Sequence, residues 1–211
     1  MKDIIITGFQ PFGSARYNPT MDVVQYFDGK QYDYDKVKGL ILPVAFEQAA
    51  KQLAEAIQGI DPYLVLSVGL AAGREDLNVE VKGVNIMNAQ NPDANGRKPV
   101  NEIIDPQGPE EIPVILTGFQ IGSVVEDLTT AGIGAIMSYD PGKYVCNDLM
   151  FRTLSYLAKN RSPIQFGFFH MPWLEQYRGQ EDLGVDLEGK TTMPLDEITD
   201  ALDLAVERTR M

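Results

Sequence analysis

Short apolar runs rich in β-branched residues recur along the chain, separated by segments in which apolar residues have helical spacing. The runs are Asp3–Thr7, Lys38–Val44, Tyr63–Val68, Val79–Ile86, Ile133–Ser138 and Ile164–His170. Several are almost continuously apolar, which is typical of strands covered on both faces in a parallel or mixed sheet. Helical spacing extends from Phe46 to Ile57, from Ile121 to Leu128 and from Leu195 to Val206. We therefore predict an α/β fold, a three-layer sandwich with a mostly parallel, mixed central sheet flanked by helices.

The chain length favours one domain. Its 211 residues can bury roughly 70% of the surface that the unfolded chain exposes, and no change of composition marks a boundary. We predict a single domain over residues 1–211. Asn88–Pro113 and Pro172–Thr192 fit neither strand nor helix spacing, and both are longer than ordinary connections. We expect them to be functional loops, partner contacts or partly disordered segments.

Acidic residues outnumber basic ones by 30 to 18. A negative surface repels phosphate backbones and anionic lipid headgroups, so we expect neither nucleic-acid nor membrane partners. The first residues carry one basic side chain and too short an apolar run for a secretory signal, and no stretch approaches the length of a membrane span. One cysteine cannot form an internal disulfide. These features predict a cytoplasmic protein.

The chain has one cysteine, Cys146, and one histidine, His170, so any thiol–imidazole chemistry must use these two. Cys146 follows a Pro-Gly turn where a strand ends and a helix begins. Backbone amides at a helix start can stabilise a thiolate, lower the thiol pKa and bind an oxyanion. His170 closes a buried strand, and sites in open α/β sheets form outside the carboxyl ends of strands. We predict that both residues lie at the same edge of the sheet, as a nucleophile and its base.

Each candidate also has a plainer interpretation. A lone buried cysteine is more often an inert apolar residue, and a lone histidine at a strand end is more often structural. Glu80 shares a face with Lys82 if the strand Val79–Ile86 is regular. A carboxylate there could orient His170, but an ion pair on an edge strand fits the spacing equally well. One cysteine and one histidine cannot supply the usual zinc ligands, so we predict no metal.

Two glycine-containing segments follow predicted strands. Gly8–Gly13 matches neither the dinucleotide-binding fingerprint nor the P-loop, and Gly69–Arg74 also lacks a phosphate-binding signature. Neither segment indicates a nucleotide cofactor. The first segment carries Phe9 and Phe12 on a tight loop at the sheet edge, where two aromatic rings suit a flat apolar ligand.

Five groups of segments together resemble the pyrrolidone-carboxylate (pyroglutamyl) peptidase family in order and spacing. They are Thr7–Gly13 with Asn18–Thr20, Val68–Arg74, Val79–Glu80 with Val84–Asn85, Ser138–Asn147 and Gly167–Pro172. The resemblance implies an α/β cysteine peptidase that removes an N-terminal pyroglutamyl residue from small peptides without metal or cofactor. It further implies a homo-oligomer, a tetramer or a dimer.

The resemblance also implies roles for individual residues. Cys146 falls on the family's nucleophile, His170 on its base and Glu80 on the acid that orients the base. The pocket for the lactam ring falls on Phe9, Phe12, Leu70, Tyr144 and Val145.

Three positions depart from the family pattern. Leu70 stands where many bacterial members have Gln, Val81 where members often have Arg, and Gln90 where many have Arg. Gln90 can still donate to an oxyanion or to the substrate, but it brings no charge. These departures leave two alternatives open. One is a non-catalytic member that binds a small molecule or a protein, and the other is a cysteine amidohydrolase with a shifted substrate.

Overall fold

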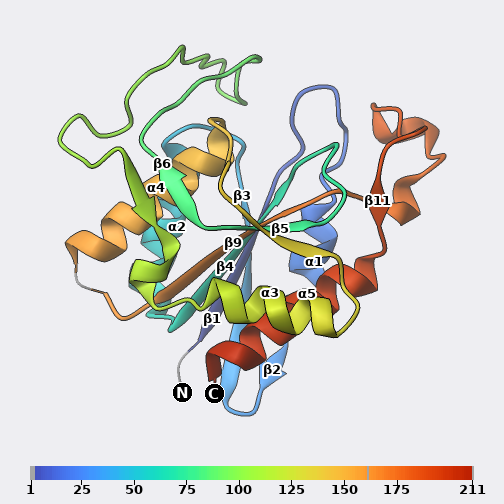
Figure 1. The fold of residues 1–211 in the computed structure, drawn as a ribbon. Coiled ribbons are helices and arrows are strands. Elements are labelled where there is room, and N and C mark those ends of the chain that lie inside the picture. The colour runs from blue at the N-terminus through green and yellow to red at the C-terminus, as the bar shows by residue number, and fades with distance from the viewer. Residues whose placement is uncertain (1–2, 161, 211) are drawn as a thin grey trace.

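The computed structural model describes residues 3–160 and 162–210, and a seven-stranded mixed sheet forms its centre (Figure 1). The strand order is β2-β3-β1-β4-β9-β5-β8. The strands are β1 (Ile4–Phe9), β2 (Gln31–Tyr32), β3 (Asp35–Leu42), β4 (Leu64–Leu70), β5 (Leu77–Glu80), β8 (Ala135–Ser138) and β9 (Gln165–Met171). Strands β3, β1, β4 and β9 are parallel, whereas β2, β5 and β8 run the opposite way. The predicted mostly parallel, mixed sheet is confirmed.

Helices cover both faces of this sheet, as the three-layer prediction requires (Figure 1). On one face α2 (Gln48–Ile60) packs against α4 (Val145–Lys159). On the other face α5 (Leu195–Arg210) packs against α1 (Thr20–Phe27) and α3 (Ile121–Thr130). Because both faces are covered, all six residues of β1 are buried, which explains the continuous apolar runs in the sequence.

The apolar run Val79–Ile86 is not one regular strand, contrary to the prediction. Strand β5 ends at Glu80, and β6 (Lys82–Val84) pairs instead with β7 (Glu111–Pro113) in a separate two-stranded sheet. Glu80 is buried within the main sheet, whereas Lys82 forms an ion pair with Glu111. The two side chains therefore do not share a face.

Contacts with α4 explain why the chain leaves the main sheet at this point. A Cβ atom on Gly83 would lie 2.9 Å from the Phe151 backbone, so β6 lies directly against the helix. The buried Asn147 side chain accepts from the Val84 amide and donates to the carbonyls of Val84 and Ile86, each at 2.9 Å. Asn147 thus supplies hydrogen bonds that a neighbouring strand would otherwise supply.

The segment Asn88–Pro113 is largely irregular, and side chains anchor it to the rest of the chain. The Asp93 carboxylate accepts from the Phe46 amide at 2.9 Å, just before α2. The Asn85 side chain accepts from the Asp105 amide at 2.8 Å. Strand β7 and the 3₁₀ helix η1 (Val114–Thr117) then return the chain to the sandwich.

The segment Pro172–Thr192 contains short regular elements that its polar sequence did not predict. Strand β10 (Trp173–Leu174) pairs in parallel with β11 (Thr192–Met193). Between them lie the 3₁₀ helices η2 (Glu175–Tyr177) and η3 (Glu181–Leu183). Among the helices of the described residues, none has the length and apolar character needed to cross a membrane.

Candidate active site

A cavity of about 210 Å³ lies at the sheet edge where the parallel strands β1, β4 and β9 end. Both Cys146 and His170 line it. His170 is the penultimate residue of β9, and Cys146 is the second residue of α4. The two residues predicted as nucleophile and base thus lie at one edge.

Strand direction alone does not explain this proximity. Strand β8, which precedes Cys146, runs opposite to β9, so its carboxyl end does not lie at the same edge as that of β9. Residues 139–144 connect β8 to the start of α4 and bring Cys146 to β4 and β9. The predicted edge is correct, but a connecting segment accounts for it.

Gly69 in β4 provides the space in which the sulfur and the imidazole meet. A Cβ atom on this glycine would lie 3.0 Å from Cys146 Sγ and 3.0 Å from His170 Cδ2. Both atoms therefore border the same point above the strand. Cδ2 is bonded to Nε2, so Nε2 lies one bond from the ring atom that borders this point.

The opposite edge of the imidazole is held by a buried carboxylate. His170 Nδ1 lies 2.7 Å from Glu80 Oε1, across the neighbouring strands β9 and β5. A carboxylate at this position favours the tautomer with its proton on Nδ1, which leaves Nε2 free to accept a proton. Strand β5 lies between β9 and β8, so Glu80 does not belong to an edge strand.

The thiol holds its proton more tightly than the helix-start argument predicted. Cys146 is partly exposed as a residue, but its sulfur faces inward between Gly69 and His170. Burial raises the pKa of the Cys146 thiol from 9.0 to about 12, and the charge of Glu80 acts in the same direction. The thiol's own backbone amide and Arg74 oppose this shift but do not overcome it. Forming a thiolate therefore requires transfer of the proton to an adjacent base.

The predicted pocket residues line the same cavity, with aromatic rings on one side. Phe9 is buried and Phe12 is partly exposed at the rim. The Tyr144 ring lies between Phe12 and Phe46, with centroid distances of 6.3 and 5.3 Å. Val145 also lines the cavity, and Leu70 adds an apolar wall at the end of β4.

Gln90 is exposed and does not line the cavity. Two polar side chains that the sequence analysis gave no role do line it, Asn18 and Arg74. Arg74 also contacts Glu80, with Nη1 2.8 Å from Oε1. The sequence could have indicated a role for Arg74, because this residue ends the glycine-containing segment at the end of β4. That segment lies at the sheet edge where the site was expected.

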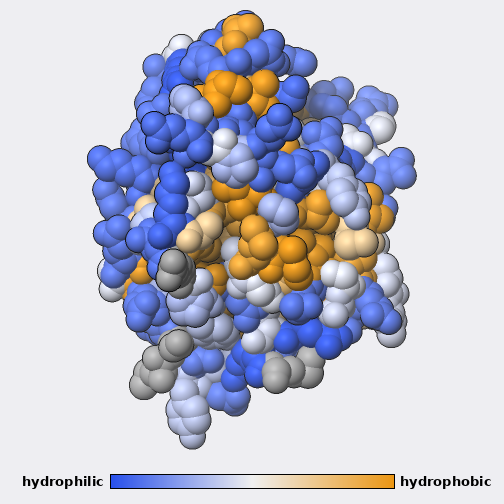
Figure 2. Space-filling model, turned by 60° about the vertical axis from the view of Figure 1, so that its left-hand side comes forward, coloured by the Kyte–Doolittle hydropathy of each residue, from blue (hydrophilic) through white to orange (hydrophobic). Residues whose placement is uncertain are grey.

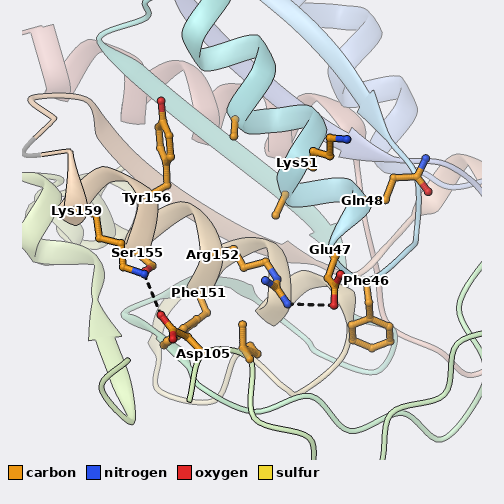
Figure 3. A pocket seen from close by; sticks show the side chains of 13 residues that line it. Phe46, Glu47, Gln48, Lys51, Asp105, Phe151, Arg152, Ser155, Tyr156 and Lys159 are labelled. Carbon is orange, nitrogen blue, oxygen red and sulfur yellow. Dashed lines mark hydrogen bonds and ion pairs between the residues drawn. The ribbon is translucent and has the colours of Figure 1, made fainter. Parts of the chain in front are cut away.

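A larger cavity of about 820 Å³ lies between α2 and α4 (Figure 3), and neither Cys146 nor His170 lines it. Four of its five charged side chains form ion pairs with one another. Arg152 lies 3.5 Å from Glu47, and Lys159 lies 2.9 Å from Asp105. None of the residues that line this cavity is a cysteine or a histidine. Within residues 3–160 and 162–210, no group of three or more His, Cys, Asp or Glu side chains is arranged to hold a metal ion.

An α/β sandwich whose sheet edge holds a thiol and an imidazole in one cavity, with a carboxylate bonded to the imidazole, has the architecture of a cysteine hydrolase. Within this class, the family model for pyroglutamyl peptidase matches residues 2–210 of the chain. The chain belongs to the pyroglutamyl peptidase family, whose members are cysteine-type omega-peptidases.

Individual relatives agree with this assignment. A pyrrolidone-carboxylate peptidase from Yersinia pestis is 34% identical over 206 residues, covering 98% of this chain and 92% of the relative. One from Thermococcus litoralis is 36% identical over 173 residues, covering 82% and 77%. The solved pyrrolidone carboxyl peptidase of Thermococcus litoralis superposes with a TM-score of 0.88 at 34% identity, covering 98% of this chain and 92% of that one. Pyroglutamyl peptidase I from Bacillus amyloliquefaciens gives 0.85 at 31% identity, covering 97% and 92%.

Proposed function

We propose that the protein removes an N-terminal pyroglutamyl residue from small peptides, with Cys146 as nucleophile, His170 as base and Glu80 as the residue that orients the base. One observation carries the proposal. Cys146 Sγ and His170 Cδ2 each lie 3.0 Å from a single point above Gly69, in a cavity with an aromatic wall. The family relatives support the peptidase over a purely binding role.

The reaction follows from the arrangement of the three side chains. Cys146 Sγ attacks the carbonyl that joins pyroglutamate to the next residue, while His170 Nε2 takes the thiol proton. Backbone amides at the start of α4 bind the tetrahedral oxyanion. His170 then protonates the leaving amine, which departs and leaves a thioester on Cys146. Water, activated by the same imidazole, hydrolyses the thioester and restores the thiol.

The cavity favours a lactam over an ordinary N-terminus. Its volume of about 210 Å³ is below the range typical of drug-sized ligands, so it suits a single small ring. Phe9, Phe12 and Tyr144 offer apolar faces to that ring. An ordinary peptide would have to bury an ammonium group there without a carboxylate partner, at a cost of several kcal/mol. The Leu70 side chain cannot hydrogen-bond to the lactam, so ring contacts carry more of the selectivity.

A chromogenic pyroglutamyl amide tests the proposal directly. The purified protein should hydrolyse this amide, and alanyl and prolyl amides should react at least about 100-fold more slowly, because each carries a protonated N-terminal amine near neutral pH. The Cys146→Ser variant should lose nearly all activity. Equal rates on all three amides, or an active serine variant, would contradict the proposed reaction.

We further propose that the protein is cytoplasmic and assembles as a homo-oligomer, a tetramer or a dimer. An exposed apolar face supports the assembly. Ile115, Met137 and Tyr139 are exposed around a depression of about 450 Å³ beside β8, the end strand of the sheet. We call these three residues the β8 face. Figure 2, which brings forward the side of the molecule that carries β6, shows apolar side chains gathered near the middle of the view.

A further inference from the structure

Arg74 lies in the turn after β4, and its guanidinium joins several parts of the site. Nη1 lies 2.6 Å from Asn78 Oδ1, 2.8 Å from Glu80 Oε1 and 3.0 Å from Ser138 Oγ. Nη2 donates to the Asp140 carbonyl at 2.6 Å. Arg74 therefore connects the carboxylate beside the imidazole with the Pro-Gly turn that leads into α4.

The environment of Glu80 explains why such a cation is needed. The Glu80 side chain is 0% exposed, and its Oε1 serves both His170 Nδ1 and Arg74 Nη1. Its Oε2 has no hydrogen-bond partner among the described residues. An ionised carboxylate with one free oxygen is strongly destabilised when buried unless an opposite charge compensates it.

Charge balance identifies Arg74 as the compensating group. His170 must be neutral before it can accept the thiol proton, and in that state Arg74 is the cation paired with Glu80 among residues 3–160 and 162–210. With Arg74 present, the arginine, carboxylate, imidazole and thiol carry no net charge before or after the proton moves from Sγ to Nε2. Without Arg74 the same group carries a net negative charge in a buried site. The Glu80–His170 pair would then take up a proton from solvent more readily.

We propose that Arg74 is a positioning residue of this site, which keeps the buried Glu80 ionised and directed at His170 while the imidazole is neutral. This inference rests on the proposed peptidase function, but it concerns the protonation of a side-chain pair and can be measured without turnover. Titratable or charged side chains from several elements line the cavity or bond to the His170 ring. They are Glu80 from β5, Cys146 and Tyr144 at the start of α4, and Arg74.

The experiment uses the single histidine of the chain, whose ring Hε1 signal reports only His170 in an NMR pH titration. Arg74→Met and Arg74→Gln should move the titration midpoint of that signal up by about one pH unit or more, because a positive charge next to the pair is lost. Arg74→Lys keeps the positive charge beside the pair and should leave the midpoint within about 0.3 units of the parent.

Activity on the pyroglutamyl amide gives a second readout. In Arg74→Met we expect kcat to fall by roughly 10- to 100-fold with KM changed less than about threefold, and the acidic limb of kcat/KM to move with the NMR midpoint. Arg208→Met is the matched control. Arg208 is also paired with a carboxylate, that of Asp127, and its side-chain exposure of 32% is close to the 25% of Arg74.

Two outcomes would overturn the inference. One is an unchanged His170 titration midpoint in folded Arg74→Met or Arg74→Gln protein. The other is an Arg74→Lys variant whose midpoint rises as far as that of the methionine variant. If both neutral variants fail to fold, the lysine variant alone decides. A folded lysine variant with the parent midpoint supports the inference, and one with a raised midpoint refutes it. A parent protein that does not cleave the amide would refute the proposed function, whereas the NMR titration would still test the role of Arg74.

Discussion

The Glu80 side chain is buried at the site, and the sulfur of the partly exposed Cys146 is desolvated beside it. The carboxylate has two hydrogen-bonding groups, the imidazole and a guanidinium, close to one of its oxygens. At the thiol, burial outweighs the opposing effects of its own backbone amide and Arg74, and it raises the pKa of Cys146. The residue types at the site were predictable from the sequence. Their protonation was not, because it depends on desolvation by residues far apart in the chain.

Replacing Glu80 with Gln tests the orienting role. The amide keeps the shape of the side chain but removes the charge that stabilises the imidazolium, so we expect kcat to fall by roughly 10² to 10⁴ with KM little changed. Glu111→Gln is the control, since Glu111 is an ion-paired and well-exposed carboxylate of the neighbouring sheet. Steady-state kinetics with thermal melting separate lost chemistry from lost folding. A Glu80→Gln enzyme within about twofold of the parent kcat would leave only a Cys146–His170 dyad.

The raised pKa of Cys146 predicts how stability depends on pH. The unfolded thiol loses its proton near pH 9.0, whereas the folded thiol keeps it to about pH 12. The folded state therefore binds more protons across this interval, and its stabilisation is complete below about pH 9 and is lost as pH rises toward 12. The Cys146→Ala variant lacks this contribution. The parent should lose more unfolding free energy than the variant over this interval, by up to about 1.4 kcal/mol per pH unit.

Urea unfolding of both proteins at about pH 8 and about pH 10.5, one below and one within that interval, measures this difference. Buried tyrosines whose pKa is also raised, such as Tyr32 and Tyr63, are present in both proteins, so their contributions cancel in the comparison. Parallel loss of stability in the parent and the alanine variant would mean that the sulfur is not desolvated in the way described.

At the scale of elements, periodicity predicted most strands of the main sheet and the helices α2, α3 and α5, but it missed the short elements and the break between β5 and β6. The run Val79–Ile86 is divided because Asn147 bonds to the β6 backbone, an interaction across the fold that no local pattern contains. Helix α1, with eight residues, is too short for a strong periodic signal. The two-residue strands β10 and β11 exist only as a pair, so neither sequence alone could indicate them.

Strand β4 has an element-scale role that a single substitution tests. A Cβ atom on Gly69 would enter the space between the sulfur and the imidazole, with Phe168 Cε1 at 3.1 Å on a third side. Gly69→Ala should therefore displace the nucleophile from the base and lower kcat by at least about 100-fold, since sub-ångström to ångström misplacement has effects of this size. The fold should persist, because β4 keeps its hydrogen bonds.

Gly59→Ala is the matched control for this strand variant. Gly59 lies in α2, and a Cβ atom added to it would have no other group within 4 Å, so alanine there should leave activity unchanged. The same change should raise stability by about 0.5–1 kcal/mol, because alanine favours a helix over glycine. Kinetics and melting of the two variants give the comparison. A Gly69→Ala enzyme with normal kcat would show that the sulfur and the ring do not meet over this strand.

At the scale of the whole molecule, the sheet edge that carries the site was predictable, but the route of the chain to it was not. Phe9, Leu70 and His170 lie at or near the ends of three adjacent parallel strands, which is the general rule for open α/β sheets. Cys146 follows a strand of opposite direction, so residues 139–144 must bring it to that edge. Arg74 holds this connection through the Asp140 carbonyl, and the same guanidinium contacts Glu80. The proposed base and the proposed nucleophile are thus linked through one side chain as well as through the sheet.

The β8 face is the surface through which we expect copies of the chain to associate. Strand β8 ends the main sheet, so among the described residues no strand pairs with its outer backbone groups, and the exposed side chains of Ile115 and of Met137 in β8 border one depression there. A second copy of the chain would cover both features. The net charge of −12 on each copy opposes association, so association should be stronger at higher salt, where this repulsion is screened.

Met137→Lys places a charge in that contact and should shift the protein toward monomer, with the dissociation constant raised at least about tenfold. Ile103→Lys, at an equally exposed apolar residue of the long irregular segment, should leave the assembly unchanged. Light scattering at micromolar concentration, at low and moderate salt, measures all three proteins. A monomeric parent would exclude the oligomer, and an oligomer that tolerates Met137→Lys but dissociates with Ile103→Lys would place the contact on the long segment instead.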